Sequence, residues 1–124
     1  MEKELMYRTN SYAQVKRLLK GKSKRKLANN TNITNYGSES IYLELHGHHI
    51  AEFTNKYVKL SSCGYQTRTT KNRLNMALHL YAPNYVPNQI LLQIHGEWYL
   101  VDKDGTQHMF VDGIRISEKG KIIK

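Results

Sequence analysis

The sequence predicts an α+β protein, with an antiparallel sheet or a small barrel, a short N-terminal helix and one helix in the middle of the chain. Several stretches alternate apolar and polar residues with a period of two, which is typical of strands with one buried face. Two other stretches repeat apolar residues every three or four positions, which is typical of amphipathic helices. The strand stretches form two similar groups of three, so the sheet or barrel is expected to consist of two similar three-stranded meanders.

Length and composition limit the organisation of the chain. Its 124 residues, 40% of them hydrophobic, suffice for one core and are too few for two, so residues 1–124 are expected to form a single domain. The one cysteine, Cys63, excludes an internal disulfide and a cysteine-based zinc framework, as expected in a reducing compartment. The apolar runs are far shorter than the roughly 20 residues that span a membrane. The first ten residues hold no apolar signal segment, so a soluble intracellular protein without a membrane partner is expected.

A basic N-terminal helix and tail are expected over residues 1–30. Apolar residues recur at helical spacing before Gly21, which predicts a helix over 12–20 that ends at this glycine. The charged residues that follow are expected to form the tail. The Asn- and Thr-rich stretch after the tail predicts a loop that enters a weak strand at 32–36. The apolar positions of the helix are Tyr12, Val15, Leu18 and Leu19.

The first meander is expected over residues 40–61. Apolar and polar residues alternate from position 41 to 45, and the glycine that follows marks a turn. Two further strands are expected at 49–53 and 57–60. The alternation predicts that one face of these strands is buried and that the other carries polar side chains.

A second helix is expected over residues 69–81, between the two meanders. Thr69 or Thr70 is suited to cap its N-terminus, and Pro83 is suited to end it. Its apolar face consists of Leu74, Ala77, Leu78 and Tyr81. The other side carries Lys71, Asn72, Asn75 and His79.

The second meander is expected over residues 89–111, with strands at 90–94, 98–102 and 107–111. A Lys-Asp-Gly sequence between the last two strands predicts a hairpin turn. Residues 113–117 and 121–123 are expected to add a last edge strand or hairpin.

The first strands of the two meanders resemble each other. Shifted by 49 positions, residues 41–47 overlay residues 90–96, and His46 matches His95. This repeat predicts that both meanders pack into one sheet or a small barrel. Chance similarity between two amphipathic strands is the alternative.

The net charge of +9 is unevenly distributed along the chain. Residues 1–30 carry +7, residues 31–52 carry −3, residues 53–96 carry +5, and the remainder is balanced. Such a density of like charges favours an anionic partner, RNA or DNA above all. A solvated helix end that keeps the protein soluble is the alternative. The densest stretch contains Lys16, Arg17, Lys20, Lys22, Lys24, Arg25 and Lys26, which we expect to bind the partner.

A second candidate site lies where the chain enters the middle helix, over residues 61–75. A helix N-terminus has free N–H groups and the positive end of a dipole, which together favour an anion. Threonine hydroxyls and basic side chains surround this point, and Tyr65 is the aromatic residue most suited to contact a partner. Alternatively, the threonines only cap the helix and Arg73 makes a structural contact. The expected binding residues are Tyr65, Arg68, Thr69, Thr70, Lys71 and Arg73, with Thr67 adding a further hydroxyl.

Two segments, GKSKRKLANNT and CGYQTRTTKNRLN, resemble a pattern in a family of small proteins encoded by tailed bacteriophages. The resemblance covers roughly residues 20–80 and departs from the pattern at Cys63, where the family has a glycine. It implies a phage accessory protein in the host bacterial cytoplasm and transfers no catalytic role. The matching positions are Gly21, Ser23, Asn29, Asn30, Thr31, Leu45, His46, Gly64, Tyr65, Thr67, Thr69, Thr70, Lys71, Arg73, Leu74 and Asn75.

The histidines invite two chemical hypotheses. His46, His48 and His49 are close in sequence, but no cysteine or acidic pair completes a metal site, so surface histidines are expected and no cofactor or metal is predicted. A metal-independent ribonuclease needs a base, an acid and a cation, for which His46, His95 and Arg73 are the candidates. Their positions at matching strand ends explain these histidines equally well.

Taken together, these features predict a basic phage protein that binds nucleic acid without catalysis. The partner is RNA or DNA, or a host ribonucleoprotein or nuclease, and an inhibitor of the anti-CRISPR kind is one specific form. The alternatives are a small metal-independent ribonuclease and a virion or assembly component.

Overall fold

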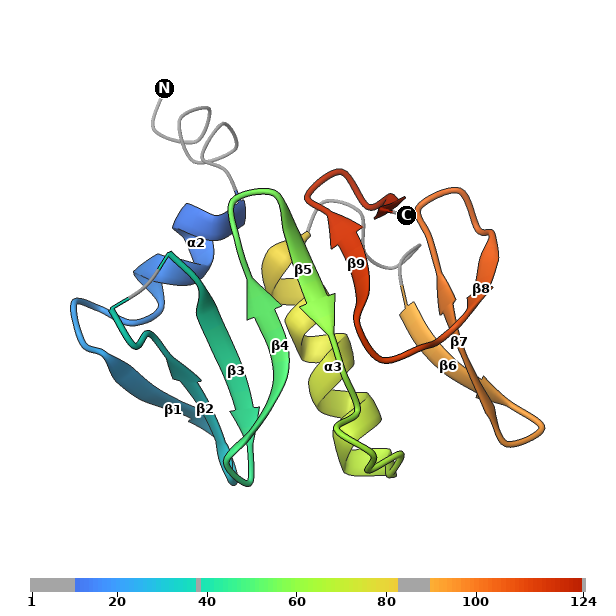
Figure 1. Cartoon of the computed structure of the whole chain (residues 1–124), viewed down its shortest axis with the longest axis horizontal. Coiled ribbons are helices and arrows are strands. Elements are labelled where there is room, and N and C mark those ends of the chain that lie inside the picture. The colour runs from blue at the N-terminus through green and yellow to red at the C-terminus, as the bar shows by residue number, and fades with distance from the viewer. Residues whose placement is uncertain (1–10, 38, 83–89, 124) are drawn as a thin grey trace.

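The computed structural model describes residues 11–37, 39–82 and 90–123, which form two antiparallel sheets and two helices (Figure 1). The seven-stranded sheet contains, in spatial order, β1 (Lys24–Ala28), β2 (Thr31–Thr34), β3 (Ile41–Leu45), β4 (His48–Phe53), β5 (Tyr57–Leu60), β9 (Ile114–Ser117) and β10 (Ile122–Ile123). The other elements are the helices α2 (Ser11–Arg17) and α3 (Arg68–Tyr81) and the three-stranded sheet of β6 (Ile90–Ile94), β7 (Glu97–Val101) and β8 (Gln107–Met109). The prediction of an α+β fold is confirmed. It allowed either an antiparallel sheet or a small barrel, and the described strands form open sheets rather than a barrel.

The first meander forms as its alternation predicts. β3, β4 and β5 pair in order, and the apolar residues on one face of each strand are fully buried. Helix α3 crosses this face, behind β4 and β5 in Figure 1. Helix α2 packs beside α3 on the same side, with Val15 and Leu19 in the core. The opposite face of the sheet carries the polar side chains.

The structure corrects the prediction of a basic tail. Residues 24–28 form the edge strand β1, and residues 29–30 form the turn to β2. The prediction missed β1 because four of the residues at 22–26 are Lys or Arg, which hide the period of two. Alternation is nevertheless present: Lys24 and Lys26 are exposed, whereas Arg25 and Leu27 are half-buried on the helix side. The arginine head donates from Nη1 to the carbonyl of Leu18 at 2.8 Å, which joins β1 to the residues after α2.

Helix α2 ends at Arg17, three residues before the predicted end. The chain continues through a series of tight turns to Gly21, where Lys20 and Gly21 both adopt positive φ, 51° and 80°. Gly21 therefore terminates the turns that follow the helix rather than the helix itself.

The second meander also forms, but it builds a separate sheet, so the prediction of one sheet containing both meanders is wrong. β6, β7 and β8 pair in order, and Leu91, Trp98 and Leu100 join the same core as the first meander. The predicted last hairpin forms as β9 and β10. It returns to the first sheet, where β9 pairs with β5.

The similarity between the meanders extends to the conformation of their first turns. His46 and Gly47 have φ values of 52° and 81°, and His95 and Gly96 have 52° and 82°. Two successive residues with positive φ are the pattern of a type I′ hairpin turn, which matches the twist of the strands it joins. The shift by 49 positions therefore aligns two hairpins of the same construction.

Helix α3 contacts both sheets through polar as well as apolar side chains. Arg73 donates from Nε to the buried hydroxyl of Thr31 on β2, at 2.8 Å. The Asn75 side chain accepts from the N–H of Leu91 at 2.7 Å and donates to the carbonyl of the same residue at 3.0 Å, so its amide caps the edge of β6. Asn75 therefore faces the second sheet, which corrects the prediction that it lies on the outer side of the helix.

The predicted apolar face of α3 is confirmed: Leu74, Ala77, Leu78 and Tyr81 are all fully buried. Pro83, the predicted helix stop, lies outside the described residues. Among the helices that the structure describes, none has the length and apolarity to cross a membrane.

The β6–β7 turn offers a direct test of its backbone conformation. We expect Gly96→Ala to lower the free energy of unfolding by about 1 kcal/mol, because an L residue is strained at positive φ. A Cβ at this position meets no atom within 4 Å, so steric clash does not contribute. His95→Asn should instead raise the stability by about 0.5 kcal/mol, because asparagine tolerates the left-handed region better. Urea unfolding of both variants measures the two effects, and equal stability of Gly96→Ala and the parent chain would contradict the assigned turn.

Candidate functional site

The predicted basic stretch places exposed basic side chains on α2, on the turns that follow it and on β1. Six of these side chains are exposed and form no ion pair with any carboxylate of the described residues, and we call them the basic surface. Arg25 differs from them, because its guanidinium binds the Leu18 carbonyl. The basic surface consists of Lys16, Arg17, Lys20, Lys22, Lys24 and Lys26.

A hollow of about 330 Å³ opens within the basic surface. Lys16 of α2 and Lys22 of the following turns both line it, together with Ser23 and Asn35. Two ammonium groups from separate elements therefore border one concave space with polar neighbours. Such an arrangement suits a phosphate group, which lysine contacts as a flexible point charge.

The start of α3 is capped by Thr67, which corrects the prediction of Thr69 or Thr70. Thr67 has extended backbone geometry, and its hydroxyl accepts from the N–H of Thr70 at 3.1 Å. The Thr70 side chain is buried and its hydroxyl lies 3.0 Å from that of Thr67. Thr69 is exposed. Thr67 and Thr70 therefore stabilise the start of the helix, which agrees with the alternative that the threonines cap it.

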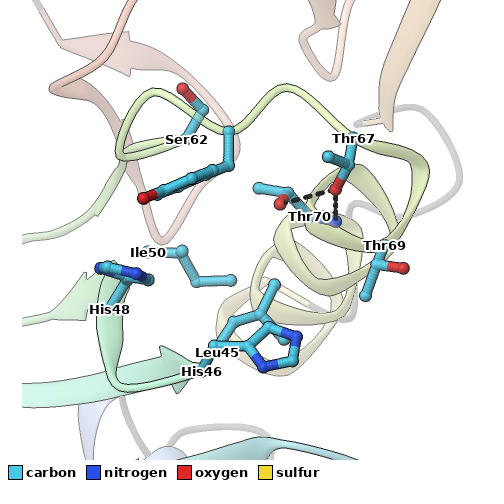
Figure 2. Close-up of a pocket in the computed structure, with 9 residues that line it drawn as sticks. Leu45, His46, His48, Ile50, Ser62, Thr67, Thr69 and Thr70 are labelled. Carbon is cyan, nitrogen blue, oxygen red and sulfur yellow. Dashed lines mark hydrogen bonds between the residues drawn. The ribbon is translucent and has the colours of Figure 1, made fainter.

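A pocket of about 380 Å³ lies between this helix start and the β3–β4 turn (Figure 2). His46 and His48 line it from the turn, and Thr67, Thr69 and Thr70 line it from the helix, as Figure 2 shows. Its other lining residues are Leu45, Ile50, Ser62 and Tyr65.

The cations predicted to surround the helix start are not among the described residues that line this pocket. Arg68 is exposed elsewhere on the surface, Lys71 is half-buried, and Arg73 binds Thr31 on β2. Tyr65, by contrast, is 54% exposed, and its ring centroid lies 5.0 Å from that of His48. The pocket therefore offers hydroxyls, imidazoles and an aromatic ring, but no charge from lysine or arginine among its described walls.

The loop before α3 is held by hydrogen bonds to Asp112 and to side chains of the loop itself. Asp112 accepts from both the N–H and the hydroxyl of Ser62, at 2.7 and 2.9 Å. Cys63 has a φ of 53°, in the left-handed region, as a tight turn at this position requires. The thiol donates to the carbonyl of His49 at 3.3 Å, which gives the side chain a local partner.

The histidines do not assemble the predicted catalytic set. The turns that contain His46 and His95 lie on either side of α3 in Figure 1, and Arg73 is directed to β2. His46 and His48 do line the same pocket. Within the described part of the chain, no three His, Cys, Asp or Glu side chains are placed to bind one metal ion.

Sequence reasoning missed a polar cluster on the open face of the seven-stranded sheet. Glu44 of β3 is only 3% exposed there, and its carboxylate accepts from the hydroxyls of Thr34 and Tyr36 and binds Nε2 of His49 at 2.8 Å. His49 reaches this face because β4 has a bulge: Ile50 and Ala51 are both buried, which turns His49 away from the core. Strict alternation gives the opposite orientation, so the pattern of the sequence contained no signal for this contact.

The hydrogen bonds of the cluster determine the protonation of Glu44. Burial alone raises the pKa of this carboxyl, but the bonds from Tyr36, Thr34 and His49 favour the ionised form, and together with the charge of His49 they lower the pKa below its ordinary value. The same contact with Glu44 raises the pKa of Tyr36, so the phenol remains protonated and donates. At neutral pH the cluster therefore contains an ionised carboxylate with at least two donors.

These features define a small basic α+β protein in which, over the described residues, two helices cover one face of a seven-stranded sheet and leave the other face open. A family model described as Kyanoviridae Gp96 protein matches residues 8–117, so the chain belongs to this family of cyanophage proteins. The match confirms the expected phage origin, and it extends over both sheets, beyond the segment in which the sequence resemblance was found. No curated protein and no solved structure matches the chain.

The capping role of Thr67 leads to the first prediction for the site. We expect Thr67→Ala to lower the free energy of unfolding by about 1 kcal/mol, because the N–H of Thr70 loses its acceptor. Thr69→Ala is the matched control, since this side chain is exposed and should have little effect. Urea unfolding compares the two variants. A larger loss of unfolding free energy for Thr69→Ala than for Thr67→Ala would indicate that Thr69 caps the helix, as the sequence predicts.

The Glu44 cluster predicts a dependence of stability on pH. A folded-state pKa below the ordinary 4.5 means that the ionised carboxylate stabilises the folded protein above this pH, and that the contribution is lost as pH falls through the lowered pKa. We expect Glu44→Gln to cost about 1 to 3 kcal/mol at pH 7, and the difference from the parent chain to shrink below pH 4.5. Unfolding by urea across a pH series measures this difference. Glu97→Gln, at an exposed carboxylate, is the control, and a constant difference for Glu44→Gln at every pH would contradict the assignment.

Proposed function

We propose that the protein binds nucleic acid through the basic surface and does not catalyse a reaction on it. The observation that supports this proposal is the group of six exposed cations, which lack carboxylate partners among the described residues. Unpaired like charges at this density repel each other in the free protein. A polyanion relieves the repulsion, and the release of its counterions adds to the binding free energy.

The hollow between Lys16 and Lys22 gives this surface a defined phosphate contact. Two further cations follow the hollow along β1, where Lys24 and Lys26 project from the same face of the strand. Their arrangement suits a backbone with repeated phosphates better than a single small anion.

Membership of a phage protein family is consistent with a ligand encountered in the infected bacterial cytoplasm. A host ribonucleoprotein, including the target of an anti-CRISPR inhibitor, would present its own nucleic acid to the same surface. We propose binding in preference to ribonuclease activity, because the two histidines of the candidate catalytic set lie in turns on either side of α3.

Charge reversal tests the proposal. We expect Lys22→Glu, Lys24→Glu and Lys26→Glu in one chain to weaken binding of labelled RNA and DNA. The slope of log K against log salt concentration should fall in magnitude by about 3, because each lysine that contacts a phosphate contributes about one unit. Fluorescence anisotropy across a salt series gives both quantities. Arg25 is left intact, since its contact with Leu18 supports the fold.

A second triple variant separates a site from the effect of total charge. Lys56→Glu, Lys119→Glu and Lys121→Glu change the net charge equally at exposed positions away from the basic surface, and should weaken binding much less. Equal losses of affinity for the two triple variants would show that binding depends on net charge and not on the basic surface. Absence of binding by the parent chain even at low salt would overturn the proposal and favour a protein partner.

A further inference from the structure

Three aromatic rings form a group on the open face of the seven-stranded sheet. Tyr42 of β3 and His49 of β4 stack with their ring centroids 4.4 Å apart and their planes 24° apart. Tyr36, which follows β2, contacts both rings, at 5.6 Å from His49 and 6.1 Å from Tyr42. The three come from separate parts of the sequence, and we call them the aromatic group.

The aromatic group is held in place and yet accessible. Glu44 lies beneath it and binds both the Tyr36 hydroxyl and the His49 imidazole, which fixes the orientation of these two side chains. Tyr36 is nevertheless 62% exposed, and the side chain of His49 is 43% exposed. Rings that are ordered before binding lose little conformational entropy when a ligand stacks on them. The arrangement therefore suits recognition of a flat group.

A hollow of about 230 Å³ lies against the stacked pair. Tyr42 and His49 line one side of it, and Glu52, Lys59 and Ser61 line the remainder with Ala51. The hollow joins an aromatic wall to polar groups that can donate and accept hydrogen bonds. Both properties match a nucleobase, which has a flat face and a polar edge.

Cations flank the aromatic group on the same face of the sheet. Lys24 pairs with Thr34, which pairs with Tyr42, so the lysine lies in the same cross-strand row two strands away, about 10 Å at the usual strand spacing. Beyond Tyr42 the row continues through Glu52 to Lys59 and then to Arg115. Lys24 belongs to the basic surface, which therefore extends directly to the rings.

The two carboxylates on this face do not oppose an anionic ligand strongly. Glu44 is buried beneath the rings and satisfied by three side chains. Glu52 is in an ion pair with Lys59 at 3.3 Å and also accepts from Ser40 at 2.7 Å. Both negative charges are thus engaged within the protein, whereas Lys24 and Lys26 are exposed.

We propose that the aromatic group stacks on unpaired bases, so that the ligand of the basic surface is a single-stranded nucleic acid. This inference rests on the proposed nucleic-acid binding and specifies its substrate class. Stacking on aromatic side chains requires the flat face of a base, which a duplex buries between neighbouring pairs. Lys24 and Lys26 hold the backbone while Tyr36, Tyr42 and His49 hold the bases. Because every base has a flat face, the interaction tolerates many sequences.

An abasic oligonucleotide separates the two components of binding. It retains the phosphates and lacks the bases, so the parent chain should bind an ordinary single strand about tenfold more tightly than an abasic strand of equal length. It should also prefer the single strand to the corresponding duplex. We expect Tyr36→Ala to remove most of the preference for the ordinary strand, while affinity for the abasic strand stays the same.

Two further variants keep this test decisive. Tyr36→Phe retains the ring but not the hydroxyl and should restore the preference that Tyr36→Ala removes. Tyr99→Ala is the matched control, because Tyr99 is a partly exposed tyrosine on β7 of the other sheet and should leave binding unchanged. Equal binding of ordinary and abasic strands by the parent chain, or an unchanged preference in Tyr36→Ala, would overturn the stacking proposal and leave the basic surface intact. Failure to bind any strand would instead overturn the proposed function itself.

Discussion

Helix α3 connects the two sheets, and the remaining structure depends on this connection. Its apolar face closes the core over the seven-stranded sheet, while Arg73 reaches Thr31 on β2 and Asn75 caps the edge of β6. A further hydrogen bond runs from the Tyr81 hydroxyl to the carbonyl of Thr54, at 2.7 Å. Buried polar groups without partners are costly, so these bonds specify how the helix and each sheet align as well as adding stability. One helix thus determines which face of the large sheet is covered and which is left open.

This role changes the meaning of the polar residues around the helix start. Thr67, Thr70, Arg73 and Asn75 have the chemistry of an anion site when they are considered as a sequence, because they combine hydroxyls, an amide and a cation at a helix N-terminus. In the folded chain Thr67 and Thr70 bond to each other in the helix cap, whereas Arg73 binds β2 and Asn75 binds β6. Residues that cap a helix and residues that bind phosphate have the same donors and acceptors. Only the tertiary contacts distinguish the two uses.

The elements that sequence predicts well are those in which local pattern and tertiary environment agree. β5 occurs at the predicted residues because its apolar side chains alternate, and the His-Gly turns follow from the left-handed conformation that glycine favours. β6 also has the predicted bounds, but its buried residue is Leu91, whereas the alternating Ile90 and Ile94 are exposed. β1 was missed because its core-facing side includes Arg25, whose burial depends on a carbonyl at Leu18. The aromatic group was missed for a related reason: the bulge at Ile50 determines the direction of His49, and a bulge leaves no pattern in composition. The sequence identifies the basic residues, but it does not show that the aromatic group lies beside them on the sheet.

The register of the sheet places the basic residues of β1 on the same face as the aromatic group. Along the sequence, the tyrosines lie within the acidic segment that follows the basic stretch, which argues against a common ligand. In the sheet, β1 pairs with β2 and β2 with β3, so Lys24 and Tyr42 share a row. Of the acids in this segment, Glu44 is buried beneath the rings and Glu52 is paired with Lys59. Shifting the pairing by one residue would place the lysines and the rings on opposite faces, because side chains alternate along each strand. The bond between Arg25 and Leu18 opposes such a shift, since it holds Arg25 on the helix side and thereby keeps Lys24 and Lys26 on the open face.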